Sequence, residues 1–239
     1  MQHAQQVECD KEDHTSTNTS AGCTLADYAD AKGLPIQFLK ELGLSDITYT
    51  HQAAVRVPYY GVAGSDVAVA VRFRISLGRP SRSGTAGRTG SSPYKWKTGS
   101  KILPYGLDRL ADAHRTGHIT LCTGESDAHT LWYHGEPALG LPGASSWQER
   151  WAEYLEGIPT IYVLVEPGAG EQEMLKWLST SRIRKRARLV RLPNAKDANG
   201  LHLQHKKNFI SEWQEALSKA EPYIELPAEP ANPSCSNVQ

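Results

Sequence analysis

The sequence predicts an α/β fold in which a sheet of mainly parallel strands is covered by helices and follows a small α+β subdomain. In the second half, short apolar runs alternate with helical patterns, and strands that alternate with helices pair in parallel through right-handed crossovers. In the first half, apolar and polar residues alternate around a glycine-rich turn, as in antiparallel hairpins. A chain of 239 residues with 39% hydrophobic content can bury such a core.

Two short helices are predicted between residues 24 and 46. Thr24 suits the N-cap of the first helix, Gly33 can close it, and Pro35 suits the first turn of the second. The second helix has an apolar face made of Phe38, Leu39 and Leu42.

A β-hairpin is predicted over residues 53–77, because apolar and polar residues alternate on both sides of the turn signal at 61–65. Residues 79–93 are rich in Gly, Ser and Arg and predict a loop. One further strand is expected within residues 94–101.

The second half contains four apolar runs separated by helical patterns. The predicted strands span residues 118–123, 136–142, 160–167 and 186–193. The predicted helices span residues 128–135, 146–157, 171–181 and 208–220. Ser146 and Glu149 form a capping-box pattern that predicts where the second of these helices begins.

These patterns divide the chain into four regions. Residues 1–22 are polar and bury too little surface to offset the entropy of ordering, so we expect a disordered lead. A basic α+β subdomain follows over residues 23–105 and the α/β sheet domain over 106–222. Residues 223–239 are rich in proline and predict a disordered tail.

The composition excludes several classes of protein. No apolar stretch is long enough for a membrane span and no signal peptide is apparent, so we expect a cytoplasmic protein without a membrane partner. The four cysteines form no CxxC pair, which predicts free thiols and no zinc site. The alternative is that Cys9, His14 and Cys23 are the remnant of a metal-binding module.

The charges balance overall, with 26 Lys and Arg against 26 Asp and Glu. The whole molecule therefore has no field that would steer it to nucleic acid, and any such site must come from local clustering. Basic residues cluster between residues 72 and 101 and again between 182 and 191. Each cluster is either a binding surface or a solvated loop or helix end.

Two acidic loops follow predicted strands of the sheet. TGESD, residues 123–127, begins at the end of the first predicted strand of the sheet. EPGAGE, residues 166–171, begins at the end of the predicted strand that starts at residue 160. Ligands bind beyond the carboxyl ends of strands in an open parallel sheet, and converging carboxylates suit a hard divalent cation. The alternative is that Asp127 caps a helix and Glu166 is a rim charge.

These loops and their surroundings resemble a known family. TGESDAHTLWYHGEPALGLPGA followed by IYVLVEPGAGE is similar to the Toprim domain of bacterial replicative primases, topoisomerases and some nucleases, with its EGxxD and DxD motifs. The first half extends the resemblance to the primase catalytic core. LADYADAKGLPIQFLKELGL, AAVRVPYYGVAGSDVAVAVRFR and YKWKTGSKILPYGLDRLADAHRTGHITL resemble its opening helices, its hairpin and its approach to the Toprim strand. The resemblance covers about residues 24–220 and implies a Toprim-like sheet over residues 106–222.

The family's six acidic positions are only half retained. They fall on Thr123, Asp127, Glu166, Gly168, Asp197 and Asn199. The resemblance implies that Asp127, Glu166 and Asp197 hold Mg²⁺ or Mn²⁺, with Asp127 and Glu166 also catalytic. The acid/base glutamate of the family is replaced by Thr123, which carries no charge at neutral pH. Glu125 is the expected catalytic stand-in, because residues two apart in an extended turn project to the same side.

The resemblance implies a primase-like protein of DNA replication, of a kind also found in plasmid and phage replication modules. Its ancestral reaction is Mg²⁺-dependent nucleotidyl transfer, in which ribonucleoside triphosphates are joined into an RNA primer on a single-stranded DNA template. Arg72 and Arg74 are expected to share one solvent-facing side of a strand. Together with Lys95, Lys97 and Lys101 they predict a track for a nucleic-acid backbone.

Other functions remain open beside this one. The chief alternative is a catalytically inactive nucleic-acid-binding Toprim module. A Toprim nuclease is disfavoured by the primase-like first half, and a topoisomerase by the length of the chain. A zinc module for template recognition and a helicase-binding domain are not apparent, so we expect a replicative helicase or a separate zinc module as a partner. The alternative is that the chain is a fragment of a longer protein.

Overall fold

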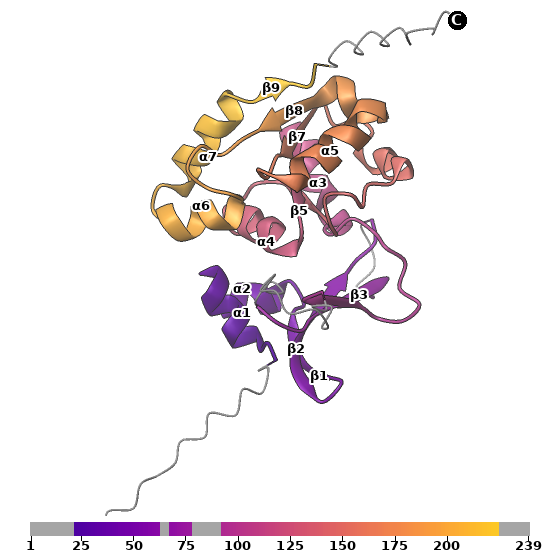
Figure 1. Ribbon diagram of the computed structural model, residues 1–239, viewed down its shortest axis with the longest axis vertical. Helices are drawn as coiled ribbons and strands as arrows, with labels where there is room; N and C mark the ends of the chain where they lie inside the picture. Colours follow the sequence, from indigo (N-terminus) through magenta and orange to yellow (C-terminus); the bar gives the residue numbers. More distant parts are fainter. Residues whose placement is uncertain (1–21, 63–66, 78–91, 225–239) are drawn as a thin grey trace, which may run out of the picture.

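A computed structural model of the protein describes residues 22–62, 67–77 and 92–224. The predicted lead at 1–22 and tail at 223–239 lie almost entirely outside these residues, as do most of the loop at 79–93 and part of the turn at 61–65. Figure 1 shows two tiers: an N-terminal tier of two helices and an antiparallel sheet, and a larger tier built on the second sheet. No helix among the described residues combines the length and hydropathy needed to cross a bilayer.

Two short helices open the described chain, as predicted. Helix α1 (Leu25–Lys32) begins after Thr24, whose side chain forms a capping box with Asp27, and Gly33 closes the helix with φ 63°. Helix α2 (Ile36–Glu41) follows directly. Both helices lie beside the second tier, facing α4 and α6 in Figure 1.

The first sheet contains four antiparallel strands in sequence order. They are β1 (Ser45–Tyr49), β2 (Gln52–Tyr59), β3 (Ala70–Arg74) and β4 (Tyr94–Trp96). The predicted hairpin is confirmed by the pairing of β2 with β3, and the further predicted strand is β4. Strand β1 was not predicted, because it is a short, mostly exposed edge strand with no buried residue and only two apolar ones, Ile47 and Tyr49.

The second sheet has the order β6-β5-β7-β8-β9. Its strands are β5 (His118–Thr123), β6 (Ala138–Leu141), β7 (Thr160–Leu164), β8 (Ala187–Val190) and β9 (Glu221–Pro222). The first four pair in parallel and β9 is antiparallel, so the predicted α/β class and its four strands are confirmed.

Helices cover both faces of this sheet. The α-helices are α3 (Leu110–Thr116), α4 (Glu125–Tyr133), α5 (Ala169–Thr180), α6 (Ala198–His205) and α7 (Phe209–Ser218). The 3₁₀ helices are η1 (Leu107–Arg109), η2 (Glu149–Leu155) and η3 (Arg182–Arg186). In β5, Leu121 packs in one apolar cluster with α3 and α5, while Cys122 packs in the other with α4, α6 and α7, as the two-residue period of a strand requires.

The helix predicted at 146–157 differs from the structure in type and start. It is the 3₁₀ helix η2, and its N-cap is Gln148, without a side-chain cap. The predicted capping box does not form, because the Ser146 hydroxyl donates to the carbonyl of Gly143 at 2.6 Å and does not cap the helix. The Glu149 carboxylate instead accepts from the backbone N–H of Arg182 at 2.8 Å, so this residue ties η2 to η3.

The two tiers share one apolar cluster. Tyr59 of β2 contacts the ring of Tyr105, which contacts that of Trp132 in α4. His129 of α4 is fully buried and forms hydrogen bonds with the hydroxyl groups of Tyr28 in α1 (3.0 Å) and Tyr105 (2.9 Å). Burial lowers the pKa of His129 to about 3, so it is neutral at physiological pH. The junction between the tiers is therefore a packed, hydrogen-bonded core.

Candidate functional site

A cleft of about 490 Å³ lies where strands β3 and β4 of the first sheet face the carboxyl ends of β5 and β7. It is the edge at which an open parallel sheet binds its ligands. Both acidic and basic side chains line it. The charged residues that line it are Lys32, Arg72, Arg74, Asp127, Glu166, Lys196 and Asp197.

The three retained acids converge in this cleft, as the strand order predicts. Asp127 lies in the first turn of α4, Glu166 follows β7, and Asp197 is the N-cap of α6. Burial raises the pKa of Asp127 well above its usual range, and the neighbouring charges of Asp197 and Glu166 raise it further. Asp127 therefore favours its protonated form more than an ordinary carboxyl does.

Two of these acids already accept backbone hydrogen bonds. Oδ1 of Asp127 accepts from the N–H of Asn199 at 2.9 Å, and Oδ1 of Asp197 accepts from the N–H of Gly200 at 2.7 Å. The side-chain amide of Asn199 donates to the Lys32 carbonyl at 3.0 Å and to the Thr130 hydroxyl at 3.1 Å. Asn199, at a position where the resemblance implies an acid, thus links α1, α4 and α6.

Two lysines that the sequence analysis did not single out also belong to the cleft. The Lys196 ammonium lies 2.7 Å from Oε2 of Glu166 and 3.9 Å from Oδ2 of Asp197. Lys32 arrives from α1, and its pKa is lowered by burial and by nearby Arg74, against the opposing effect of Asp127. The position of Lys196 directly before Asp197 was the signal available in the sequence; for Lys32 there was none.

The arrangement fits a divalent cation poorly. Thr123 and Gly168 supply no carboxylate at two of the family positions, and Glu166 is paired with Lys196. In the described part of the chain, no three Asp, Glu, His or Cys side chains are grouped so that they could hold a metal ion. The magnesium ligands expected from the resemblance line the same cleft, but at least one oxygen of each is already engaged with another partner.

Glu125 does not project beside Thr123, and this expectation is wrong for a local reason. Helix α4 begins at Glu125, and Gly124 before it has φ 89°, so the turn is not extended. Oε1 of Glu125 accepts from the Tyr59 hydroxyl at 2.5 Å and from Nη1 of Arg72 at 2.9 Å. Glu125 is 1% exposed and does not line the cleft, whereas Thr123 does.

Arg72 and Arg74 are buried, so the prediction that both side chains face solvent is wrong. They are 8% and 7% exposed, because the second tier covers this side of β3. Arg72 pairs with Glu125 and donates to the Pro142 carbonyl at 3.2 Å. The guanidinium groups of both arginines lie 4.3 Å from the ring centre of Tyr94. Both still line the cleft, so a nucleic-acid contact for them stays a prediction.

The three lysines of the predicted track lie outside the cleft lining. Lys95 lies between Tyr94 and Trp96 in β4, so its side chain points to the opposite face of the strand from theirs. Lys97 and Lys101 are exposed beyond the end of β4. Their predicted role in binding nucleic acid would therefore involve a surface next to the cleft.

The second basic cluster is mostly engaged in structural contacts. Arg182 pairs with Glu149 of η2 at 3.3 Å, and Arg186 donates to the carbonyls of Leu155 and Ile158. The loop at 140–144 is not followed directly by a helix, so no helix N-terminus there offers its N–H groups to a phosphate. Its first residue, Gly140, packs so closely that a Cβ atom there would lie 2.5 Å from the Gly124 carbonyl oxygen.

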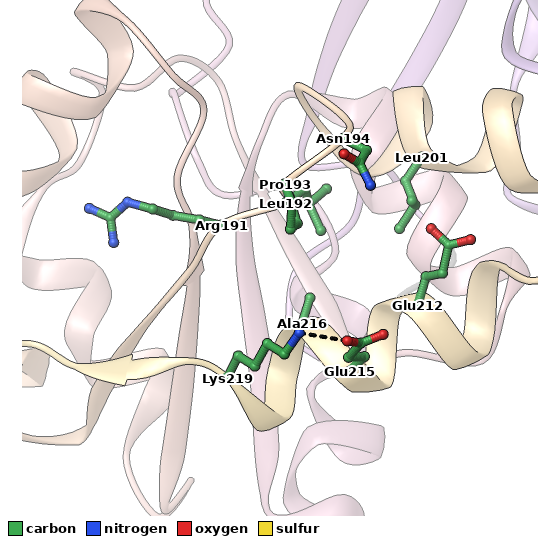
Figure 2. Close-up of a pocket in the computed structure, with 9 residues that line it drawn as sticks. All are labelled: Arg191, Leu192, Pro193, Asn194, Leu201, Glu212, Glu215, Ala216 and Lys219. Carbon is green, nitrogen blue, oxygen red and sulfur yellow. Dashed lines mark hydrogen bonds and ion pairs between the residues drawn. The ribbon is translucent and has the colours of Figure 1, made fainter.

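Figure 2 shows a second, smaller pocket of about 250 Å³ between the loop after β8 and helix α7. Its ionic groups are paired, and the dashed line marks the Lys219 to Glu215 contact. It shares no lining residue with the cleft. Its lining residues are Arg191, Leu192, Pro193, Asn194, Leu201, Glu212, Glu215, Ala216 and Lys219.

Comparison with known proteins identifies the fold. No family model matches the sequence. The Gene 57 protein of Mycobacterium phage D29 is 28% identical over 123 residues, which are 52% of this chain and 78% of that protein. The RNA polymerase domain of Mycobacterium tuberculosis primase DnaG superposes with a TM-score of 0.62 at 11% identity, over 83% of this chain and 76% of that one.

Two further solved structures agree with this match. The E. coli primase catalytic core has a TM-score of 0.59 at 13% identity, over 83% of this chain and 73% of that one. The primase fragment of the bacteriophage T7 primase-helicase protein has a TM-score of 0.57 at 16% identity, over 79% of this chain and 72% of that one. The chain therefore has the Toprim-like fold of DnaG-type primase catalytic cores, as the sequence analysis predicted.

Proposed function

We propose that this chain is a primase-fold protein of DNA replication that binds single-stranded nucleic acid along the cleft and lacks efficient nucleotidyl transfer. The shared fold supports a role in replication. A DnaG primase catalytic domain has been solved bound to single-stranded DNA, and T7 primase domains bound to an RNA/DNA hybrid. Nucleic acid is thus the ligand class that relatives of this fold bind.

The arrangement of Glu125 carries the proposal on catalysis. It is the only acidic residue in the turn at 123–125, and its carboxylate is held by Arg72 and Tyr59 behind the cleft wall. Swinging it into the cleft would leave the buried Arg72 unpaired, and breaking such a pair costs about 3–5 kcal/mol. The turn therefore offers no carboxylate for the acid/base step of transfer.

The cations of the cleft support the proposal on binding. The charge of Arg72 is balanced by Glu125, whereas Lys32, Arg74 and Lys196 share the cleft with three acids, of which Asp127 is more easily protonated than an ordinary carboxyl. Phosphate groups entering the cleft meet these cations within the span of a few nucleotides. Contacts of this kind give binding that weakens with salt and depends little on sequence.

Mg²⁺-dependent ribonucleotidyl transfer is the second candidate function. The convergence of Asp127, Glu166 and Asp197 favours it, since carboxylates on neighbouring strand ends are the usual setting for metal and triphosphate. With either function, a replicative helicase or a separate zinc module would bring the chain to its template.

The test combines primer synthesis with binding. Full-length protein is incubated with single-stranded DNA, labelled ribonucleotides and Mg²⁺ or Mn²⁺, beside Glu166→Ala and Glu125→Ala. We expect no primers above background from any of the three. Primers made by the unchanged chain and lost in Glu166→Ala would refute the proposal and support the second candidate.

Binding is followed by fluorescence anisotropy of a labelled oligonucleotide. We expect affinity to fall steeply with salt, and Lys32→Ala to weaken binding several-fold because it removes one phosphate contact. Lys40→Ala on the exposed side of α2 is the matched control and should leave affinity unchanged. Equal effects of the two substitutions would show that the nucleic acid does not enter the cleft.

A further inference from the structure

Lys196 lies within the group of acids in the cleft. Its ammonium contacts Glu166 at 2.7 Å and approaches Asp197 at 3.9 Å, so one cation is shared by carboxylates from two different loops. The Glu166 side chain is 14% exposed, while that of Lys196 is 41% exposed and lines the cleft. The ammonium therefore has one side toward the acids and another toward the cleft.

The other two acids of the group each have one oxygen with a fixed partner. Asp127 and Asp197 each use one carboxylate oxygen to accept a backbone N–H at the start of α6. A magnesium ion requires near-octahedral oxygen coordination and loses its water reluctantly. To bind Glu166 it would have to displace the Lys196 ammonium and then tolerate that positive charge a few ångströms away.

We propose that the Lys196 ammonium takes the place of a divalent cation among these acids, so that the cleft binds the phosphate groups of nucleic acid without Mg²⁺. Ammonium is a compact point charge and a common phosphate ligand, which suits it to this position. The statement about phosphate rests on the proposed function. The statement that Lys196 excludes a divalent cation does not, and it is tested separately.

Exclusion of the cation is measured by titrating the full chain with Mn²⁺ and following the electron paramagnetic resonance signal of free Mn²⁺. We expect Lys196→Gln to bind Mn²⁺ at least about tenfold more tightly than the unchanged chain, since a competing charge beside two carboxylates is removed. The gain should vanish in the double variant Lys196→Gln/Glu166→Gln. Lys219→Gln, which removes a cation from the other pocket, is the matched control and should behave as the unchanged chain.

The proposal is overturned if the unchanged chain binds Mn²⁺ as tightly as Lys196→Gln, or if the double variant keeps the gain. Nucleic-acid binding is then measured at matched ionic strength with EDTA or with Mg²⁺. We expect that Mg²⁺ does not raise the affinity of the unchanged chain for the oligonucleotide, and that it does raise the affinity of Lys196→Gln. A requirement for Mg²⁺ in the unchanged chain also overturns the proposal. Failure to bind DNA in both buffers refutes the proposed function, while the Mn²⁺ titration still decides the role of Lys196.

Discussion

Removal of the Glu125 carboxylate should destabilise the protein more than it affects any activity. In Glu125→Ala, Arg72, a residue 8% exposed in the intact chain, loses its ion pair and keeps the Pro142 carbonyl at 3.2 Å and the face of the Tyr94 ring at 4.3 Å. Breaking a buried pair from one side costs about 3–5 kcal/mol. Because Arg72 also lines the cleft and can gain water there, we expect a loss near the lower end, about 3 kcal/mol.

The loss is measured by urea unfolding followed by tryptophan fluorescence. A cost of about 3 kcal/mol corresponds to a fall in Tm of about 6–12 °C for a chain of this size. The double variant Glu125→Ala/Arg72→Met should be more stable than Glu125→Ala alone, because it leaves no unpaired buried charge. Tyr59→Phe removes one hydrogen bond to Glu125 and should cost only about 1 kcal/mol.

The reasoning is refuted if Glu125→Ala costs less than about 1 kcal/mol, the ordinary cost of losing an exposed ion pair. Glu125 would then be free to leave Arg72 and enter the cleft. The catalytic role predicted from the sequence would regain its physical basis.

Two further predictions concern pH and packing. The pKa of His129 is about 3 in the folded chain, well below the ordinary histidine value. As the pH falls below about 6.5, the unfolded chain therefore binds a proton that the folded chain does not. The contribution of His129 to the free energy of unfolding should be fully present above that pH and should fall by about 1.4 kcal/mol per pH unit below it. Urea unfolding at pH 7.5 and 5 should show a shallower dependence in His129→Gln, and equal slopes would exclude this histidine as the cause. Gly140→Ala should cost about 1–3 kcal/mol, because the added Cβ meets the Gly124 carbonyl. Gly143→Ala, where a Cβ meets nothing within 4 Å, should be nearly neutral, and similar unfolding midpoints for the two variants would contradict the packing described here.

Strands and strand ends were predictable because their signals are local. Strands β5 and β7 are rich in apolar residues, and the acids that follow them, Asp127 and Glu166, had to meet at one edge of the sheet. Helix α6 was missed because buried polar residues, Asn199 and His202, occupy positions where a helical pattern requires apolar ones.

The partners of the site residues were not predictable in the same way. Arg72 and Glu125 are 53 residues apart, and whether the arginine faces solvent or the second tier depends on how the tiers pack. Lys32 likewise reaches the cleft only through the packing of α1 on α4 and α6. No periodicity within either segment reports such long-range packing.

Asn199 restricts how the acidic set could be restored. Its amide nitrogen donates to the Lys32 carbonyl and the Thr130 hydroxyl, and an aspartate has no donor to offer either oxygen at neutral pH. A fourth carboxylate would also add negative charge next to Asp127, whose pKa is already raised by burial and by Asp197 and Glu166. A single substitution back to the family residue would therefore weaken the attachment of α1 before it improved any metal site. Restoring an acid at position 199 would therefore require compensating changes at the segments that Asn199 contacts in α1 and α4.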